Sequence, residues 1–335
     1  MPGDSLSLEA LCELVRSPLR PTRTSPGQQP YLILKLDDNG DALSADECAA
    51  VVRWSQRQPC PVIAIGLELR EELRPAVDVI VADAVAAESV LNNIRRSPLA
   101  AMMLVQVLRM TQHLPIEQAL TAESLAYSAL QGGPEFRRWL AQRPPRASNH
   151  IEKTRSSIVL ERDAGVLKIQ LNRPERRNAL SAQMRDELFA ALEVVACDPS
   201  IRIARLSGAG ECFSAGGDLD EFGTTPDSAT AHWIRSVQLP ARLLAECADR
   251  LEFRLHGACI GAGIEMPAFA RRVAATRDAF FELPELRFGL IPGAGGCVSI
   301  PRRIGRHNTA WLALSGERID ARQALAWGLV DSIVN

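Results

Sequence analysis

The chain has 335 residues, of which 47% are hydrophobic, 23% charged and 5% aromatic, and its formal net charge is −2. This length favours two domains or one large domain with an extension, and the mean hydropathy of −0.02 is typical of a globular protein. Basic and acidic residues are balanced along the chain, so we expect no nucleic-acid partner. Only three of the 38 basic residues are lysines, so bound anions should be held by arginine.

The sequence shows no targeting or metal-binding motif. Residues 1–16 lack the basic start and long apolar core of a signal peptide, and the longest apolar run, residues 99–108, is too short to cross a bilayer. The eight cysteines form no CxxC pair and have no histidine at metal-site spacing. We therefore expect a soluble cytoplasmic protein with reduced thiols, no bound metal and no membrane partner.

The first half of the chain is predicted to contain a leader and a mixed region. Residues 1–29 are predicted to be disordered or extended, because prolines are frequent in residues 16–30 and few residues there could pack. Residues 30–145 are predicted to form an α/β and helical region. Its expected elements are strands at 31–36, 61–65 and 77–81, a helix opened by the capping box Ser44–Glu47, and helices over 84–142 with breaks at Pro98, Pro115 and Gly132–Pro134.

A polar linker at residues 146–157 is predicted to lead into a second region at residues 158–335. The alternation of strands and helices in this region indicates an α/β layered fold. The expected elements are a hairpin of 158–161 with 166–171, a helix at 181–196, a strand at 201–207, short helices at 308–315 and 320–327, and a strand at 330–334. The run VDSIV at 330–334 is similar to VDVIV at 77–81, which by itself fits chance similarity of two strands.

A glycine-rich segment, residues 257–267, is the most informative stretch. Its glycines permit sharp turns, and Pro267 is tolerated only in the first turn of a helix, so a helix should begin near Ile264. The free N–H groups of residues 262–264 would then form an anion or oxyanion site. Glu265 would lie in the first turn, where the helix dipole favours the ionised form. The alternative is a packing turn with a capping glutamate.

Two further turns carry polar residues. Residues 212–219 follow a predicted strand and could supply a second oxyanion N–H near Ser214, whereas Asp218 is interpreted as a turn or cap residue. Glu285 lies 20 residues beyond Glu265 and precedes another glycine-rich turn. Two carboxylates beside oxyanion donors suit the addition of water to a polarised double bond. Taken alone, Glu285 is better explained as a solvated loop carboxylate.

These segments resemble the enoyl-CoA hydratase/isomerase family, the crotonase superfamily. The resemblance implies an α/β fold of the crotonase (ClpP-like) type, a spiral of ββα units, preceded by the N-terminal α/β and helical region. It covers about residues 156–335, over half of the chain. The matching motifs are at 171–180, 213–219, 257–265, 284–285, 292–296, 314–316, 321–324 and 328–331.

The resemblance places the family's functional residues on particular positions. The oxyanion N–H groups fall on Ser214 and Ala262, and the glutamates of the hydratases fall on Glu265 and Glu285. CoA enters as part of the substrate, so no separate cofactor and no metal are implied. The expected substrate-binding residues are Asn178, Ala179, Leu180, Ala215, Gly216, Asp218, Gly261, Pro284 and Gly293.

One departure concerns the end of the chain. Family members continue after the motif at 328–331 with a helical tail that caps the active site and builds the trimer, whereas this sequence stops at Asn335. The VDVIV run at 77–81 is followed by helices that are similar to such a tail. We hypothesise that residues 30–145 are a shortened crotonase-like unit whose helices take the place of the tail. An unrelated N-terminal partner domain is the alternative.

The resemblance and the glutamate pair predict an enoyl-CoA hydratase, a hydro-lyase of fatty acid metabolism. Its expected partner is an acyl-CoA thioester, and its expected assembly is a homo-oligomer, a trimer or hexamer. Other enolate chemistry of the superfamily stays open, namely isomerisation, ring hydrolysis or cofactor-free oxygenation of an aryl-acetyl-CoA. A catalytically silent CoA-binding subunit is the alternative from a different class.

Overall fold

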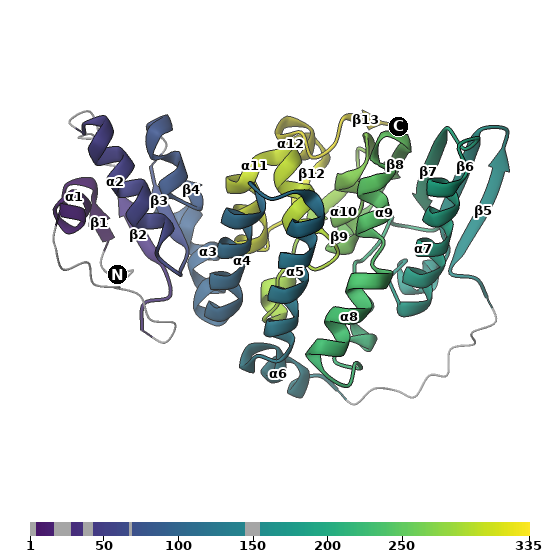
Figure 1. Ribbon diagram of the computed structural model, residues 1–335, viewed down its shortest axis with the longest axis horizontal. Helices are drawn as coiled ribbons and strands as arrows, with labels where there is room; N and C mark the ends of the chain where they lie inside the picture. Colours follow the sequence, from purple (N-terminus) through teal and green to yellow (C-terminus); the bar gives the residue numbers. More distant parts are fainter. Residues whose placement is uncertain (1–4, 17–27, 36–42, 67–68, 145–154) are drawn as a thin grey trace.

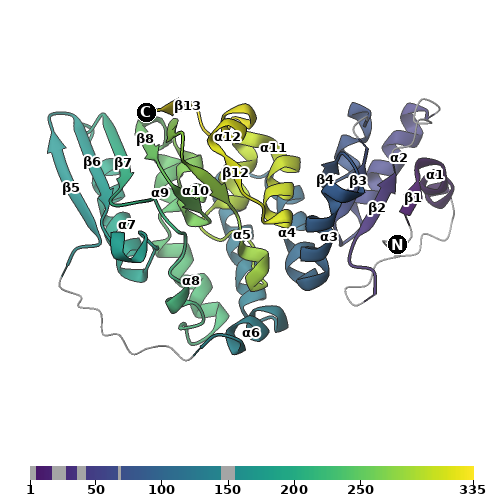
Figure 2. The ribbon, with the colours of Figure 1, turned by 180° about the vertical axis from the view of Figure 1, so that it is seen from behind.

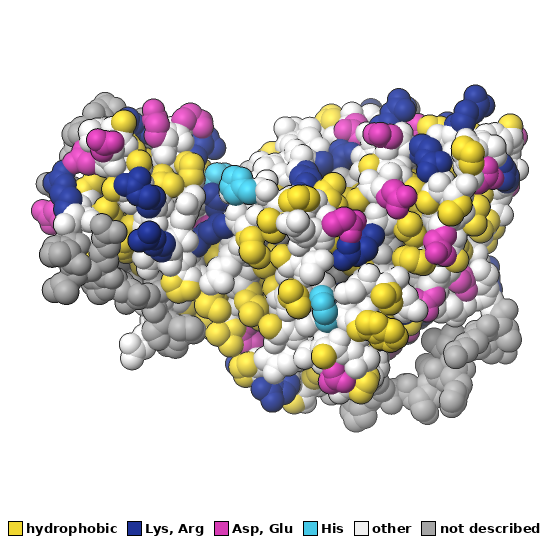
Figure 3. Space-filling view, in the orientation of Figure 1, with side chains coloured by type: hydrophobic (Ala, Val, Ile, Leu, Met, Phe, Trp, Pro, Cys, Tyr) yellow, Lys and Arg dark blue, Asp and Glu magenta, His cyan; other side chains and the backbone are white. Residues whose placement is uncertain are grey.

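The computed structural model describes residues 5–16, 28–35, 43–66, 69–144 and 155–335. Its described strands form a four-stranded, a six-stranded and a three-stranded sheet. Figure 1 shows the four-stranded sheet at one end of the molecule, the six-stranded sheet at the other, and a layer of helices between them. Acidic and basic side chains are interspersed on the face shown in Figure 3, in keeping with the balanced charge of the sequence.

The N-terminal sheet is parallel, with its strands in chain order. It consists of β1 (Ser5–Ser7), β2 (Leu32–Lys35), β3 (Val62–Ile65) and β4 (Val79–Val81), and it packs with α1 (Leu8–Arg16), α2 (Ala45–Gln56) and the 3-10 helix η2 (Glu71–Ala76). The predicted capping box of α2 is confirmed, because the Ser44 hydroxyl accepts from the Glu47 N–H.

The prediction of an extended leader over residues 1–29 is wrong for the described residues 5–16. They form β1 and α1, and the side chains of Leu11 and Val15 are buried against the N-terminal sheet. Apolar residues of this short helix gather on one face, but the proline-rich residues that follow obscured this pattern in the sequence. Residues 17–27 of the predicted leader lie outside the described residues.

Four helices follow the N-terminal sheet and confirm the predicted helical segment with its breaks. Pro98 and Pro134 each occupy the first turn of a helix, where the missing N–H costs no hydrogen bond, and Asp83 caps the first of the four. The helices are α3 (Ala84–Arg96), α4 (Pro98–Thr111), α5 (Ile116–Gln131) and α6 (Pro134–Ala141). The predicted linker that comes next lies largely outside the described residues.

The second region begins with the predicted hairpin, β5 (Ile158–Asp163) and β6 (Val166–Leu171), which is antiparallel. The strands that follow in the same sheet pair in parallel, in the order β13-β10-β8-β7-β6-β5. They are β7 (Ile203–Gly208), β8 (Leu251–Leu255), β10 (Arg272–Thr276) and β13 (Ser332–Val334). A small second sheet holds β9 (Ala258–Ile260), β11 (Phe280–Glu282) and β12 (Ile319–Asp320).

One helix of the second region, α11, is longer than predicted. The predicted helix at 308–315 is the last part of α11 (Gly296–Ser315), whose two halves meet at a kink where Gly305 has φ 77°. The other helices are α7 (Ala182–Cys197), α8 (Ser228–Gln238), α9 (Ala241–Glu246), α10 (Ala262–Glu265) and α12 (Ala321–Trp327). The strands and helices alternate as the predicted crotonase-type α/β spiral requires.

The helices of the N-terminal half pack on the second region. Helices α3, α4 and α5 pack against α11, and α5 also packs against α8 (Figures 1 and 2). The Thr111 hydroxyl donates to the Cys297 carbonyl at 2.9 Å, and the Ser97 hydroxyl donates to the Leu286 carbonyl at 2.7 Å. Apolar side chains of α4 and α11 belong to one hydrophobic core. The two halves of the chain are therefore joined by a continuous core.

The sequence echo between 77–81 and 330–334 has a structural counterpart. The Asp78 N–H donates to the Val62 carbonyl at 2.7 Å, and an Asp78 carboxylate oxygen accepts from the Val62 N–H at 2.9 Å. Asp331 makes the same reciprocal pair with Val273, at 2.7 Å in both directions. Each aspartate also pairs with an arginine of α11. The two halves thus attach their last parallel strand in the same way.

The two aspartates differ in burial, which gives a prediction for stability. Asp78 is 1% exposed and pairs with Arg109 and Arg306, whereas the Asp331 side chain is 41% exposed. Asp78→Ala leaves Arg109 and Arg306 without their carboxylate partner. We therefore expect the free energy of unfolding to fall by about 3–5 kcal/mol. Asp331→Ala should cost about 1 kcal/mol or less. Urea denaturation compares the two variants, and equal losses would contradict the prediction.

Candidate active site

Glycine-rich turns of the second region meet at the start of α10. Gly261, which precedes the helix, has φ 51° and is therefore in a conformation that side chains other than glycine rarely adopt. A methyl group built on Gly261 would lie 2.6 Å from Glu285 Oε1 and 3.8 Å from Glu265 Oε1. The two glutamates predicted from the sequence therefore come together beside one glycine. The prediction that a helix begins near Ile264 is confirmed, with α10 starting at Ala262.

Glu265 is held by the turn that leads into α11. Its carboxylate Oε2 accepts from the N–H groups of Ala294 and Gly296, at 2.7 and 2.9 Å. Its backbone carbonyl accepts from the Ser299 hydroxyl at 2.7 Å. Glu265 is only 2% exposed. The two bonds to Oε2 fix the carboxylate, and the other oxygen, Oε1, lies on the side of Gly261.

Glu285 is less constrained. It lies at the first position of the 3-10 helix η7 (Glu285–Phe288), and its Oε2 is buried with no hydrogen-bond partner among the described residues. Buried polar atoms are nearly always paired in folded proteins, so an unpaired carboxyl oxygen beside a second carboxylate indicates a functional group. This oxygen is free to donate a proton to, or accept one from, a bound molecule.

Burial raises the pKa of both glutamates and so favours their protonated forms. Burial raises the pKa of Glu265 to about 7, against the opposing effect of the N–H groups of Ala294 and Gly296. Burial and then the charge of Glu265 raise the pKa of Glu285 well above its usual range. Glu265 titrates near neutral pH, and both burial and the charge of Glu265 favour the protonated form of Glu285. A pair of carboxyls with separated pKa values can act as one acid and one base.

The raised pKa of Glu265 predicts a pH dependence of stability. Between the ordinary value of 4.5 and about 7, the folded protein binds a proton at Glu265 that the unfolded chain releases. The resulting stability is fully present below pH 4.5 and is lost as the pH rises through 7, at up to about 1.4 kcal/mol per pH unit. Urea denaturation of wild type and Glu265→Gln from pH 5 to 8 measures it. The wild type should lose stability relative to the variant, and a constant difference would contradict the prediction.

The predicted oxyanion donors need one correction. The Ser214 N–H donates to the Ala258 carbonyl at 3.1 Å and is not available to a ligand, so this prediction is wrong. Ser214 lies in an extended bridge with Cys259, and this local pairing uses its N–H. The N–H groups of Ala262 and Gly217 have no hydrogen-bond partner among the described residues. A methyl group on Gly216 would lie 3.8 Å from the Gly261 Cα, so the two turns that carry these N–H groups are adjacent.

The turn at residues 178–180 is hydrogen-bonded to the turn that carries the Gly217 N–H. The Asn178 amide donates to the carbonyls of Ala209 and Cys212, and the Leu180 N–H donates to the Gly216 carbonyl at 2.8 Å. Asn178 is fully buried with φ 52°, so its side chain serves the turn and does not reach a ligand. The predicted role of Asn178 as a binding side chain is therefore corrected to a structural one.

Asp218 has the predicted turn and cap role. It accepts from the Asp220 N–H and pairs with Arg173 and Arg176, at 3.1 and 3.3 Å. The Arg173 guanidinium also donates to the Ala179 carbonyl at 2.7 Å. The Asp220 N–H, Arg173 and Arg176 thus occupy the carboxylate of Asp218. Asp218 therefore stabilises this turn, and its side chain is not a ligand contact.

Three other predicted binding residues, Ala215, Pro284 and Gly293, are placed by the contacts of their backbone. Ala215 donates its N–H to the Arg177 carbonyl at 2.9 Å, and Pro284 precedes η7 and accepts from the Arg287 N–H at 3.0 Å. Gly293 lies in the turn that holds Glu265. A methyl group on Gly293 would lie 2.3 Å from the Tyr127 ring, so only glycine lets this ring approach.

Sequence reasoning missed two residues of α5, Glu123 and Tyr127. They are four residues apart and so lie on one face of the helix, which packs against α11. Glu123 is 1% exposed. The available signal was an acid and a tyrosine at the spacing of a buried helix face, but such a pattern is equally typical of a solvated face. Their distance of more than 130 residues from Glu265 hid the connection.

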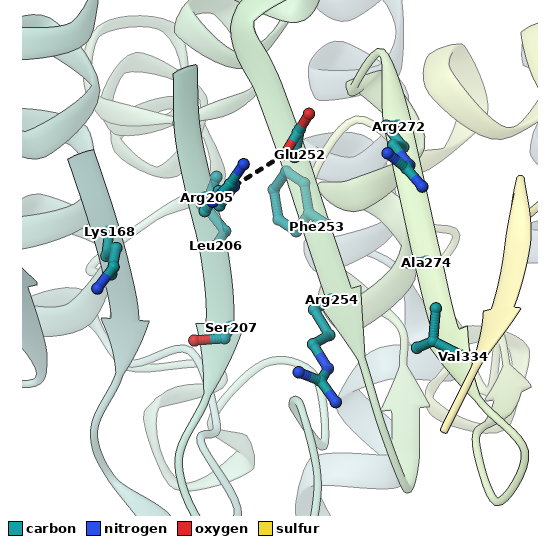
Figure 4. A pocket seen from close by; sticks show the side chains of 10 residues that line it. All are labelled: Lys168, Arg205, Leu206, Ser207, Glu252, Phe253, Arg254, Arg272, Ala274 and Val334. Atoms are coloured by element: carbon teal, nitrogen blue, oxygen red, sulfur yellow. Dashed lines mark hydrogen bonds and ion pairs between the residues drawn. The ribbon is translucent and has the colours of Figure 1, made fainter. Parts of the chain in front are cut away.

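A hollow of about 440 Å³ lies elsewhere, on the face of the six-stranded sheet (Figure 4). Basic side chains from neighbouring strands line it, and the Arg205–Glu252 ion pair crosses between β7 and β8. It contains none of the predicted site residues. Its lining residues are Lys168, Arg205, Leu206, Ser207, Glu252, Phe253, Arg254, Arg272, Ala274 and Val334.

The described residues contain neither a candidate metal site nor a helix that could span a membrane. Within the described ranges, no group of three or more histidine, cysteine or acidic side chains has the arrangement of a metal site. No described helix combines the length and the apolar character needed to cross a membrane.

The chain is an α/β protein in which two N–H groups without a partner among the described residues, those of Ala262 and Gly217, lie in adjacent turns, with the Glu265 and Glu285 carboxyls beside Gly261. The chain belongs to the enoyl-CoA hydratase/isomerase family, the crotonase superfamily, because the family model of that description matches residues 161–335. The predicted fold class is thereby confirmed, and the solved structures similar to the chain have the crotonase fold.

The relatives include both hydratases and isomerases. The 2,3-dehydroadipyl-CoA hydratase of Escherichia coli is 38% identical over 53% of this chain and 69% of its own length. The 1,2-epoxyphenylacetyl-CoA isomerase of the same organism is 34% identical over 53% of this chain and 70% of its own. Enoyl-CoA hydratase from Thermoplasma volcanium has a TM-score of 0.50 and 31% identity, over 54% of this chain and 72% of that structure.

Proposed function

We propose that the protein is an enoyl-CoA hydratase that adds water across the double bond of a 2-enoyl-CoA thioester. The observation that carries the proposal is the unpaired Oε2 of Glu285 beside the fixed carboxylate of Glu265. Hydration requires one base and one acid near the same double bond. Glu265, held by two N–H groups, is suited to be the base, and Glu285, whose protonated form burial favours, is suited to be the acid.

The proposed reaction has two steps. Glu265 takes a proton from water, and the hydroxide forms a bond to C3 while the electrons of the double bond move to the thioester oxygen. The N–H groups of Gly217 and Ala262 donate to this enolate oxygen, a contribution of about 2.7–4 kcal/mol for each donor. Protonated Glu285 then transfers its proton to C2. Proton exchange with solvent restores both glutamates, so the reaction uses no metal and no redox cofactor.

The N-terminal helices are proposed to take the place of the family's C-terminal tail over the active site. Helices α3–α5 pack on α11, and α5 brings Tyr127 against Gly293. The shared attachment of Asp78 and Asp331 supports the view that residues 30–145 are a shortened crotonase-like unit. We further propose a homo-oligomeric assembly, a trimer or hexamer, which light scattering of the purified protein measures.

A substrate panel tests the proposed function. The purified protein is offered straight-chain and aryl 2-enoyl-CoAs, and the loss of the conjugated double bond is followed by absorbance. Hydration of at least one member is expected. Double-bond migration without water addition would replace the proposal by an isomerase, and oxygen uptake with an aryl-acetyl-CoA would replace it by an oxygenase. Binding of CoA without any turnover would indicate a silent subunit.

A further inference from the structure

Helix α5 places a third buried carboxylate next to the glutamate pair. Glu123 is 1% exposed, and its two oxygens accept from the N–H groups of Gly295 and Cys297, both at 2.8 Å. These N–H groups belong to the turn and first residues of α11, 172 and 174 residues further along the chain. A side chain of the N-terminal half therefore holds the turn on which the catalytic geometry depends.

The bonds of Glu123 alternate with those of Glu265. The N–H groups of Ala294 and Gly296 go to Glu265, and those of Gly295 and Cys297 go to Glu123. Four consecutive N–H groups of one turn are thus shared between two carboxylates. Any movement of Glu123 shifts the turn and, with it, the two bonds that fix the Glu265 carboxylate.

A carboxylate buried beside a second carboxylate is energetically unfavourable, which is unusual for a residue that only caps a helix. The groups that face Glu123 are Glu265 from α10, Tyr127 from α5, Cys297 from α11 and Arg235 from α8, and beyond them Glu285 from η7. Burial and then the charge of Glu265 raise the pKa of Glu123 well above its usual range. A neutral serine or asparagine could cap a helix without bringing a second carboxyl next to Glu265. Two adjacent buried carboxyls are typical of a functional site.

We propose that Glu123 is a positioning residue for the hydration reaction: through the N–H groups of Gly295 and Cys297 it locks the turn that orients Glu265. Helix α5, which belongs to the N-terminal half, thereby completes the active site of the C-terminal half. The inference rests on the proposed function for its kinetic readout. The contacts of Glu123 with the turn are independent of the substrate.

Glu123→Gln tests the proposal. Glutamine keeps the size of the side chain but has one acceptor oxygen, and its NH2 group faces the second N–H. We expect kcat to fall by about 10- to 100-fold with KM nearly unchanged, because the substrate does not touch Glu123. The acid limb of the kcat profile should move up, because the N–H bonds from Ala294 and Gly296, which lower the pKa of Glu265, weaken when the turn is no longer held. Hydrogen exchange of the 294–297 amides should become faster.

Glu135→Gln is the matched control. Glu135 is also a buried carboxylate that accepts from two N–H groups, those of Leu99 and Ala100 at 2.8 and 3.0 Å, but it caps α4 and has no contact with Glu265. This variant should lose stability while it keeps the wild-type kcat, acid limb and exchange of the 294–297 amides. If Glu123→Gln behaves like Glu135→Gln, the proposal is overturned.

A second variant and two measurements that need no turnover test the positioning role if Glu123→Gln does not fold or if the wild type is inactive. If Glu123→Gln does not fold, Glu123→Asp replaces it, since aspartate keeps the charge but is too short to hold both N–H groups. A kcat at the wild-type level in this variant overturns the proposal, and a reduction of about tenfold supports it. If wild type hydrates no enoyl-CoA, the proposed function fails. The exchange of the 294–297 amides and an infrared titration of Glu265 then decide, and unchanged values in Glu123→Gln overturn the positioning role.

Discussion

Replacing Glu285 by glutamine is expected to lower kcat for hydration of a 2-enoyl-CoA by about 10²–10⁴-fold, with little change in KM. Glutamine has nearly the same shape and leaves the turn at η7 intact, but it has no carboxylic proton to transfer to C2. We propose that this proton leaves from the unpaired Oε2 of Glu285. The loss therefore affects the chemical step and leaves substrate binding nearly unchanged.

Glu265→Gln should reduce kcat by a similar factor, because the variant has no base to take a proton from water. The double variant should be little worse than either single one, since both residues act in one step. Stopped-flow absorbance of a 2-enoyl-CoA measures all three. Turnover that survives both substitutions would contradict the two-glutamate mechanism.

Glu282→Gln is the control for the Glu285 experiment. Glu282 lies three residues earlier and is 3% exposed, but its two oxygens pair with Arg287 and Arg318, each at 2.8 Å. The substitution removes a buried charge close to Glu285 without touching the proposed proton path. Its cost should appear in the free energy of unfolding and leave kcat near the wild-type value.

Removing residues 1–150 is expected to yield insoluble, inactive protein. Helix α11 buries Val298, Ile300 and Leu312 in cores that include residues of the N-terminal half, and the deletion exposes apolar surface on this face. Each large apolar side chain returned to water costs about 1.5–3 kcal/mol, so exposing a few of them exceeds the usual stability of a domain. The exposed face would also promote aggregation.

Expression of residues 151–335 with and without residues 1–150 as a separate chain measures this effect. Recovery of soluble, active protein only when both chains are present would support the proposal that the N-terminal helices cover the active site. A soluble and fully active 151–335 fragment would refute it and would favour an unrelated partner domain.

Much of the fold was predictable because it depends on neighbours in the sequence. The capping box at Ser44 and Glu47, the helix breaks at Pro98 and Pro134, and the hairpin of β5 and β6 follow from turn chemistry and periodicity. The exception is α1, whose short apolar stripe was obscured by the proline-rich residues after it.

For the site, the sequence by itself determined which turns carry the chemistry and which two glutamates lie in them. Tertiary structure decided the rest. Only packing shows that the Ser214 N–H is used by Ala258 and that the free donors are Gly217 and Ala262. Only packing brings Glu123 to the turn of Glu265, since the polar pattern of a helix does not reveal the surface on which it docks. Length and composition indicated two regions, and the core shared by α4 and α11 joins them into one body.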